Sequence, residues 1–201
     1  MSMTLLGSGA SPFVRKVRAM MAEAGIADIP YEEVQTSPLG GEDRINTANP
    51  LGKIPALTRD DGPTVYDSRV ITRFLDAQYD AGLYPEARIW EVLTLEATAD
   101  GIMEAAISIV YEARFRPEDM RHAPWMDGQW AKVARALDAL EGQWMSHLSG
   151  PLDMGQIAVG CALGYLDLRH GDRNWRDGHP ALAAWYEGFA ARPAMQATAP
   201  A

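Results

Sequence analysis

The chain has 201 residues, a hydrophobic content of 47% and a formal charge of −9, so it is long enough for one or two domains with a substantial core. The negative charge argues against a protein that binds nucleic-acid phosphates, because such proteins present a basic face. Cys161 is the single cysteine, which excludes an internal disulfide. Without a signal-peptide pattern or a run of 18 apolar residues, the sequence predicts a soluble protein of the cytoplasm.

The first third of the chain predicts a β-α-β order followed by β-β-α. Ser11 and Pro12 suit the N-cap and the first position of a helix, and Gly25 ends the apolar pattern that follows them. The stretch 35–49 is polar and rich in turn residues, which predicts a loop with a short helix. The predicted strands are 3–6, 31–34, 54–58 and 64–66, and the predicted helices are 12–24 and 68–78.

The rest of the chain predicts helices alone. Gly82 and Pro85 mark a linker, and the apolar stretch 153–169 is expected at the centre of the helical part. Residues 193–201 predict a frayed tail. The predicted helices are 88–114, 127–148, 153–169 and 180–192. The fold class is therefore α+β, a small sheet domain followed by a helical bundle.

Three motifs in the first third resemble the glutathione transferase family, in particular its bacterial, serine-type members. They are Ser11–Arg18 (SPFVRKVR), Asn49–Leu57 (NPLGKIPAL) and Asp67-Ser68, and the stretches 99–105 and 157–166 resemble helices of the same family. The resemblance implies a thioredoxin-like domain with a four-stranded mixed sheet over residues 1–78. A linker at 79–86 and an all-helical domain at 87–201 would follow, in a homodimer.

The resemblance also implies an activity, the transfer of glutathione to an electrophilic, hydrophobic second substrate, with a role in detoxification. Free glutathione is a weak nucleophile, because only about 3% of a thiol with a pKa near 8.5 is ionised at pH 7. Ser11 is the implied catalytic residue: its hydroxyl would donate to the sulfur, aided by the helix N-terminus and Arg15. The alternative role for Ser11 is that of a plain helix cap. Serine excludes thiol–disulfide exchange through residue 11, since a hydroxyl cannot form a mixed disulfide.

Glutathione is the implied co-substrate, and its site follows from the motifs. The implied binding residues are Phe13, Lys53, Ile54, Asp67, Ser68 and Asp100. Ile54 would pair through its backbone with the cysteinyl part, which a cis Ile54-Pro55 bond would allow, although most X-Pro bonds are trans. Ser68 and Asp67 would hold the γ-glutamyl end and Lys53 the glycyl carboxylate, unless Lys53 is only a solvated loop residue.

Two further groups of residues complete the prediction. Met103, Ile107 and Tyr111 would line the second-substrate pocket, although such residues are more often simple core. The family usually begins its central helix with Ser or Thr and has Asp three residues later. Here Asp153 and Gln156 stand at those positions, and both remain suited to a capping box.

The sequence predicts no metal site, because its four histidines are dispersed without ligand spacing. Glutathione and a small electrophile are the expected partners, with no nucleic acid and no membrane. Since a fold does not fix a function, a non-catalytic glutathione-binding or protein-interaction module remains open, as does a glutathione-dependent isomerase or lyase.

Overall fold

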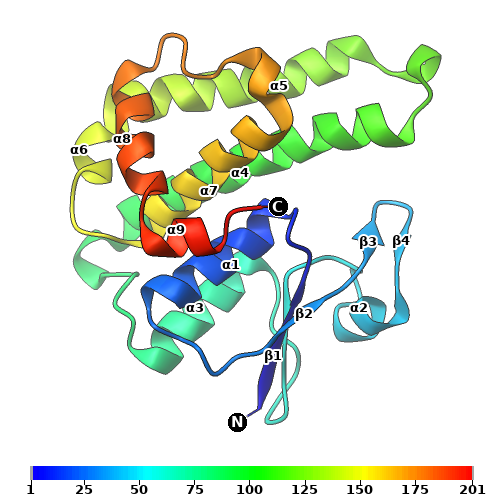
Figure 1. Ribbon diagram of the computed structural model, residues 1–201, viewed down its shortest axis with the longest axis vertical. Coiled ribbons are helices and arrows are strands. Elements are labelled where there is room, and N and C mark those ends of the chain that lie inside the picture. The colour runs from blue at the N-terminus through cyan, green and yellow to red at the C-terminus, as the bar shows by residue number, and fades with distance from the viewer. Residues whose placement is uncertain (1, 201) are drawn as a thin grey trace. The chain divides into compact units, whose positions relative to one another are not determined.

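The computed structural model describes residues 2–200, and the chain divides into two compact units (Figure 1). One unit contains residues 2–87 together with 193–200, and the other is Arg88–Arg192. The first unit combines a sheet with helices and the second is helical, which confirms the predicted α+β class.

The sheet of the first unit is built around its central strand. β1 (Met3–Gly7) pairs in parallel with β2 (Tyr31–Glu33) and antiparallel with β5 (Ala56–Arg59). The prediction of a fourth strand at 64–66 was wrong, because Val65 forms only an isolated bridge with Leu57. Asp67 already caps the next helix, so the chain between Pro63 and that cap is too short for a longer ladder.

Helices cover the two faces of this sheet. Leu6 and Ala56 cluster with Ile45 of α2 (Asp43–Ala48) on one face. The opposite face carries Gly7, where an added Cβ would meet the side chain of Val14 in α1 (Pro12–Glu23) at 2.6 Å. This glycine therefore lets strand and helix approach closely. Helix α3 (Ser68–Tyr79) packs against α1.

Two short elements of the first unit were not predicted. β3 (Thr36–Ser37) and β4 (Gly40–Gly41) form a hairpin inside the stretch expected to be loop.

The predicted frayed tail was also wrong, because α9 (Pro193–Ala197) packs against α1 and its Met195 is buried. Residues 193–200 thus belong to the first unit, although the sequence placed them with the helical domain.

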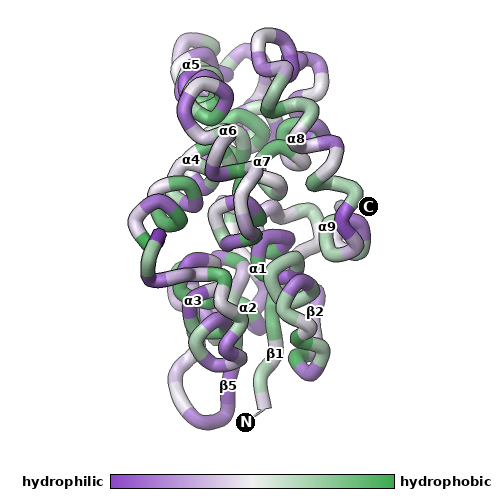
Figure 2. Tube along the Cα trace, turned by 90° about the vertical axis from the view of Figure 1, so that its left-hand side faces the viewer, coloured by the Kyte–Doolittle hydropathy of each residue, from purple (hydrophilic) through white to green (hydrophobic). Residues whose placement is uncertain are grey.

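The second unit consists of helices. They are α4 (Ile89–Phe115), η2 (Glu118–Met120), α5 (Ala123–Ala139), the π-helical η3 (Leu140–Trp144), α6 (Met145–Leu148), α7 (Met154–His170), η4 (Gly171–Arg173) and α8 (Pro180–Ala190). The short η1 (Glu86–Arg88) spans the boundary between the two units. Helix α7 packs against α4 and is buried along most of its length, so it is the core of the unit, as predicted. Its apolar residues and those of β1 form green stretches of the trace in Figure 2.

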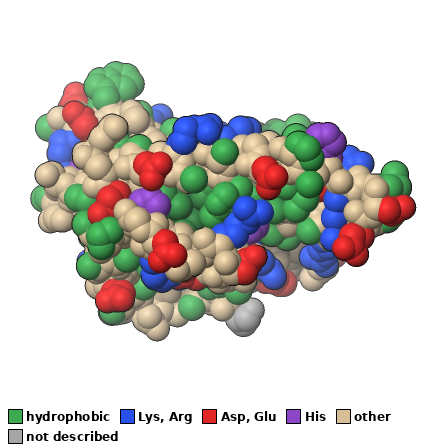
Figure 3. Space-filling view, turned by 90° about the horizontal axis from the view of Figure 1, so that it is seen from above, with side chains coloured by type: hydrophobic (Ala, Val, Ile, Leu, Met, Phe, Trp, Pro, Cys, Tyr) green, Lys and Arg blue, Asp and Glu red, His purple; other side chains and the backbone are tan. Residues whose placement is uncertain are grey.

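The surface is mixed in character. On the face shown in Figure 3, Lys and Arg side chains lie among Asp, Glu and hydrophobic ones. None of the helices described in residues 2–200 is long and apolar enough to cross a membrane.

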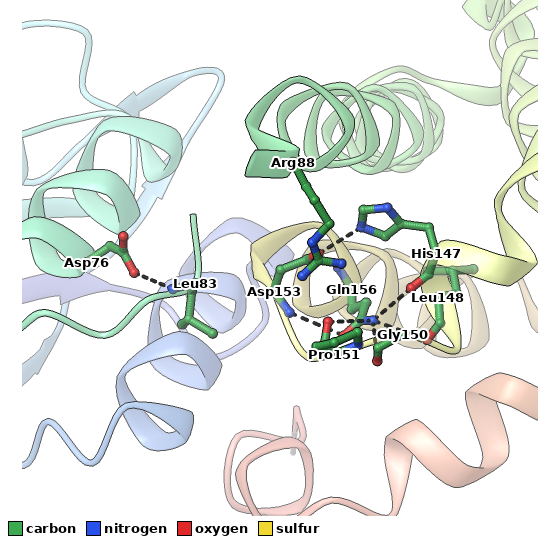
Figure 4. Close-up of polar contacts among 9 residues, drawn as sticks. All are labelled: Asp76, Leu83, Arg88, His147, Leu148, Gly150, Pro151, Asp153 and Gln156. Atoms are coloured by element: carbon green, nitrogen blue, oxygen red, sulfur yellow. Dashed lines mark hydrogen bonds and ion pairs between the residues drawn. The ribbon is translucent and has the colours of Figure 1, made fainter. Parts of the chain in front are cut away.

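The first turn of α7 contains the predicted capping box (Figure 4). Asp153 Oδ1 accepts from the Gln156 N–H, and Gln156 Oε1 accepts from the Asp153 N–H, each at 3.3 Å. The other carboxylate oxygen of Asp153 lies 2.8 Å from His147 Nε2 and 3.5 Å from Arg88 Nη2. The side-chain amide nitrogen of Gln156, Nε2, lies within hydrogen-bonding distance of four carbonyl oxygens of the preceding loop. They belong to His147, Leu148, Gly150 and Pro151, at 3.0–3.3 Å. The cap thereby also fixes the preceding loop.

His170, at the end of α7, is expected to make stability depend on pH. Its ring is buried, which lowers the pKa of His170 despite a contact with the Ala106 carbonyl. As pH falls through the unfolded-state pKa of about 6.5, the His170 side chain becomes protonated in the unfolded chain but stays neutral in the folded protein. The free energy of unfolding should therefore fall by up to about 1.4 kcal/mol per pH unit below pH 6.5.

His170→Gln, which can still donate to the carbonyl, should remove this slope in urea titrations between pH 5 and 7. His122→Asn, at the exposed cap of α5, is the matched control and should keep it. A slope unchanged by His170→Gln would contradict the assignment.

Candidate functional site

The sheet register brings the three sequence motifs of the first unit together. Leu6 pairs with Ala56 in the β1–β5 ladder, so the end of β1 that leads to Ser11 adjoins Pro55. On the other side of β5, Leu57 bridges to Val65, two residues before Asp67, so the chain leads from that bridge directly to the cap of α3.

Ser11 is the N-cap of α1. Its backbone is extended, and its Oγ accepts a long hydrogen bond of 3.4 Å from the Val14 N–H. A serine hydroxyl that accepts through a lone pair still has its own proton to donate. The two roles considered for Ser11, helix cap and donor to a ligand, are therefore chemically compatible.

The Ile54-Pro55 peptide bond is cis, as predicted, and so is Tyr66-Asp67. Pro55 is buried, and the backbone N–H and carbonyl of Ile54 make no hydrogen bond to another residue within the described range 2–200. The loop before them is shaped by Asn49, whose buried amide donates to the Lys53 carbonyl at 2.8 Å and accepts from the Leu51 N–H at 3.0 Å. Sequence reasoning quoted Asn49 as part of the motif but gave it no role.

The first turn of α3 presents one buried and one exposed polar residue. Ser68 is 3% exposed and is the first residue of the helix, where backbone N–H groups lack intrahelical partners. Asp67 is exposed, caps the helix through the Arg69 N–H at 3.1 Å and pairs with the Arg69 guanidinium at 3.2 Å. A ligand amine at Asp67 would therefore share the carboxylate with Arg69.

The remaining predicted residues differ in their surroundings. In the first unit, Phe13 is partly buried in the first turn of α1 and Lys53 is exposed. In the second unit, Asp100 and Met103 are buried on α4, whereas Ile107 is partly buried and Tyr111 is 39% exposed. Met103 is therefore surrounded by protein atoms, as a core residue is.

Two residues that the sequence did not single out lie beside predicted ones. Glu33 accepts from the Gly9 N–H at 3.2 Å and from the Tyr31 hydroxyl at 2.5 Å, so it fixes the loop that leads to Ser11. Burial opposes ionisation of Glu33, but the hydrogen bonds from Tyr31 and Gly9 together lower its pKa. Burial raises the pKa of Tyr165, close to Tyr111 in the second unit, to about 12. Side chains alternate between the two faces of a strand, so the sequence could have shown that Tyr31 and Glu33 lie on the same face of β2 and can bond to each other.

No cluster of three or more His, Cys, Asp or Glu side chains among residues 2–200 is arranged to hold a metal ion.

Comparison with known proteins adds independent information. Residues 5–83 match the family model of the glutathione S-transferase N-terminal domain, and residues 123–188 match that of the C-terminal domain. A curated relative, the uncharacterized GST-like protein YibF of Escherichia coli K12, is 32% identical over 203 residues, covering 98% of both chains.

Solved structures agree over the full length. A glutathione transferase family member from Pseudomonas fluorescens Pf-5 with bound glutathione is 45% identical, with a TM-score of 0.97 and 100% of both chains covered. A glutathione S-transferase from Methylobacillus flagellatus KT, also with glutathione bound, is 38% identical, with a TM-score of 0.90 and the same coverage. These matches confirm the thioredoxin-like assignment of the first unit and the helical assignment of the second. The chain belongs to the glutathione transferase family.

Proposed function

We propose that this protein is a serine-type glutathione transferase. It binds glutathione in the unit formed by residues 2–87 and 193–200 and uses the Ser11 hydroxyl to stabilise the thiolate. The observation that supports this most directly is the cis Ile54-Pro55 bond directly before β5, which adjoins the end of β1 that leads to Ser11, while the Leu57–Val65 bridge lies two residues before Asp67. Relatives at 45% and 38% identity have glutathione bound, which supports the same ligand here.

Each motif has a part of the tripeptide to bind. The free backbone groups of Ile54 pair with the cysteinyl residue, as a neighbouring strand would. Ser68 and the N–H groups of the first turn of α3 bind the γ-glutamyl carboxylate, because a helix N-terminus favours an anion. The Asp67 carboxylate binds the γ-glutamyl amine, and the Lys53 ammonium group binds the glycyl carboxylate. Phe13 lies along the ligand in the first turn of α1.

The reaction needs one ionisation and one substitution or addition. The thiol loses its proton to solvent, and the sulfur anion is held by the Ser11 O–H and the first turn of α1. The thiolate then attacks an electrophilic carbon: the C–S bond forms, and the displaced group or opened ring oxygen leaves with the electron pair. Ser11 donates a hydrogen bond throughout and keeps its own proton.

The second substrate is proposed to be hydrophobic and to contact Ile107 and Tyr111 on α4, which follow the buried Met103 at intervals of four residues. We also propose a cytoplasmic homodimer with a role in detoxification, in which Asp100 reaches the partner subunit's γ-glutamyl amine. A panel of aryl halides, epoxides and peroxides would identify the electrophile class. Turnover with none of them, alongside tight glutathione binding, would favour a binding module instead.

Ser68→Ala should weaken glutathione binding by roughly 1–2 kcal/mol, about 5- to 30-fold in Kd, through loss of a charge-assisted hydrogen bond. Isothermal titration calorimetry of the wild type should first show binding between micromolar and millimolar concentrations. Ser149→Ala, an exposed serine of the second unit, should bind as the wild type does. Absence of binding to the wild type at about 10 mM glutathione would overturn the proposal, since even a very weak site of about −4 kcal/mol would be detected there.

A further inference from the structure

The ladder between β1 and β2 ends just before the turn that leads to Ser11. Gly7 is the last residue of β1 in register with β2, where it lies opposite Glu33. The backbone of residues 8–11 therefore lies beyond the ladder and needs other hydrogen-bonding partners. Within this turn, the Ser11 N–H donates to the Ser8 carbonyl at 3.0 Å. The position of Ser11 thus depends on how Ser8 is held.

The side chain of Glu33 supplies partners to the turn where the backbone ladder ends. Its Oε1 accepts from the Gly9 N–H at 3.2 Å, and its carboxylate also accepts from the Ser8 hydroxyl. The other oxygen, Oε2, accepts from the Tyr31 hydroxyl at 2.5 Å. Hydrogen bonds to an ionised acceptor are stronger than those between neutral groups. A single carboxylate therefore fixes both Ser8 and Gly9, directly before the residue that caps α1.

Helix α1 is also tied back to β2 further along its length. Arg18 lies two turns after Ser11, and the central carbon of its guanidinium is 4.7 Å from the centre of the Tyr31 ring. The charge of Arg18 also favours the ionised form of Glu33. Ser11 is therefore held between two contacts with β2, one from Glu33 to the turn before it and one from Tyr31 to the helix after it.

We propose that Glu33 is a positioning residue for the Ser11 hydroxyl, acting through the turn at Ser8 and Gly9. The inference rests on the proposed function, in which Ser11 donates to the glutathione sulfur. In this role Glu33 contacts neither the sulfur nor the electrophile and transfers no proton. Because a negative charge close to the site disfavours a thiolate, Glu33 can favour ionisation only through the place it gives the hydroxyl. The charge and the positioning thus have opposite effects on the pKa of the thiol.

The test separates the acceptor of Glu33 from its charge. Glu33→Ala removes the acceptor, whereas Glu33→Gln keeps an acceptor for the Gly9 N–H and loses the charge. Glu33 is exposed, so neither variant leaves a buried cavity. Glu32→Ala is the matched control, because Glu32 carries the same charge on the opposite face of β2 and pairs with Arg44 at 3.0 Å. The pKa of bound glutathione is read from thiolate absorbance against pH, and Kd is measured for S-methylglutathione, which has no ionisable thiol.

Glu33→Ala is expected to raise the pKa of the bound thiol by about one unit, because a displaced hydroxyl loses much of its hydrogen bond to the charged sulfur. Kd for S-methylglutathione should change less than about threefold. Glu33→Gln and Glu32→Ala should leave the thiol pKa close to its wild-type value. Removal of a negative charge alone would lower the thiol pKa, so an unchanged or lowered value in Glu33→Ala overturns the inference. A rise in Glu33→Gln equal to that in Glu33→Ala would also overturn it.

The double variant Ser11→Ala/Glu33→Ala tests whether Glu33 acts through Ser11. Its thiol pKa should equal that of Ser11→Ala alone, because two changes that remove the same interaction are not additive. Shifts that add would mean that Glu33 acts on the thiol independently of Ser11, which would overturn the inference. Failure of the wild type to bind either ligand would instead refute the proposed function.

Discussion

Replacing Ser11 with alanine is expected to raise the pKa of enzyme-bound glutathione by about one to two units and to slow conjugation near neutral pH accordingly. A hydrogen bond to a charged group is worth roughly 1.5–3 kcal/mol, and one pKa unit corresponds to about 1.4 kcal/mol. Ser11 Oγ accepts only a long bond from the Val14 N–H in the described structure, so its proton is available to the sulfur. Thiolate absorbance measured against pH at saturating glutathione reports the shift directly.

Two further variants of Ser11 separate its roles. Loss of the cap alone should reduce the free energy of unfolding by about 1 kcal/mol, which urea titration measures independently of the thiol. Ser11→Thr keeps a hydroxyl and should retain most of the thiolate. Ser11→Cys should exchange conjugation for thiol-transferase activity, because cysteine can form a mixed disulfide with glutathione. If the Ser11→Ala protein keeps the wild-type thiolate absorbance and rate, the thiolate is stabilised by the helix terminus and Arg15 and not by the Ser11 hydroxyl.

Replacing Asp153 with alanine is expected to lower the free energy of unfolding by about 3–5 kcal/mol, the usual cost of removing one partner of a buried ion pair. The carboxylate is fully buried, and its loss removes the cap of α7 together with the partner of His147 and of Arg88. Helix α7 is the core of its unit, so the loss should extend beyond one turn. Equilibrium urea unfolding followed by circular dichroism measures it.

Asp153→Asn is the matched control, since its side-chain carbonyl can still accept from the Gln156 N–H while the charge is lost. We expect it to be less destabilising than Asp153→Ala. Asp153→Ser restores the residue type that the family commonly has at this position and should also retain the cap. A loss below about 1 kcal/mol for Asp153→Ala would mean that the buried pair adds little beyond an ordinary cap.

Local sequence patterns were sufficient where neighbouring residues determine the structure. Ser11 with Pro12 began α1, and Asp153 with Gln156 began α7, because a cap forms within one turn of chain. The cis bond at Ile54-Pro55 followed from the motif around it. The α+β class and the family followed from motifs that lie in the right order along the whole chain.

Other features depend on residues far apart in the sequence. The region 64–66 has strand-like composition, yet only Val65 pairs, because Asp67 already caps α3 and leaves no room for a ladder. The role of Glu33 depends on a hydrogen bond to a residue 24 positions away. Composition predicts neither the isolated bridge at Val65 nor the hydrogen bond of Glu33, since both depend on which segments of the chain lie side by side in the fold.

The sequence by itself therefore determined the fold class, the family and the caps of α1 and α7, although α5 begins at Ala123 rather than at the expected Asp127. Tertiary structure alone decided that the C-terminal segment forms α9 and that its Met195 carbonyl, 180 residues away in the chain, receives the guanidinium of Arg15. A five-residue helix is too short to be stable alone, because nucleation costs more than so few hydrogen bonds return. Burial against α1 stabilises it, and no local pattern records that contact.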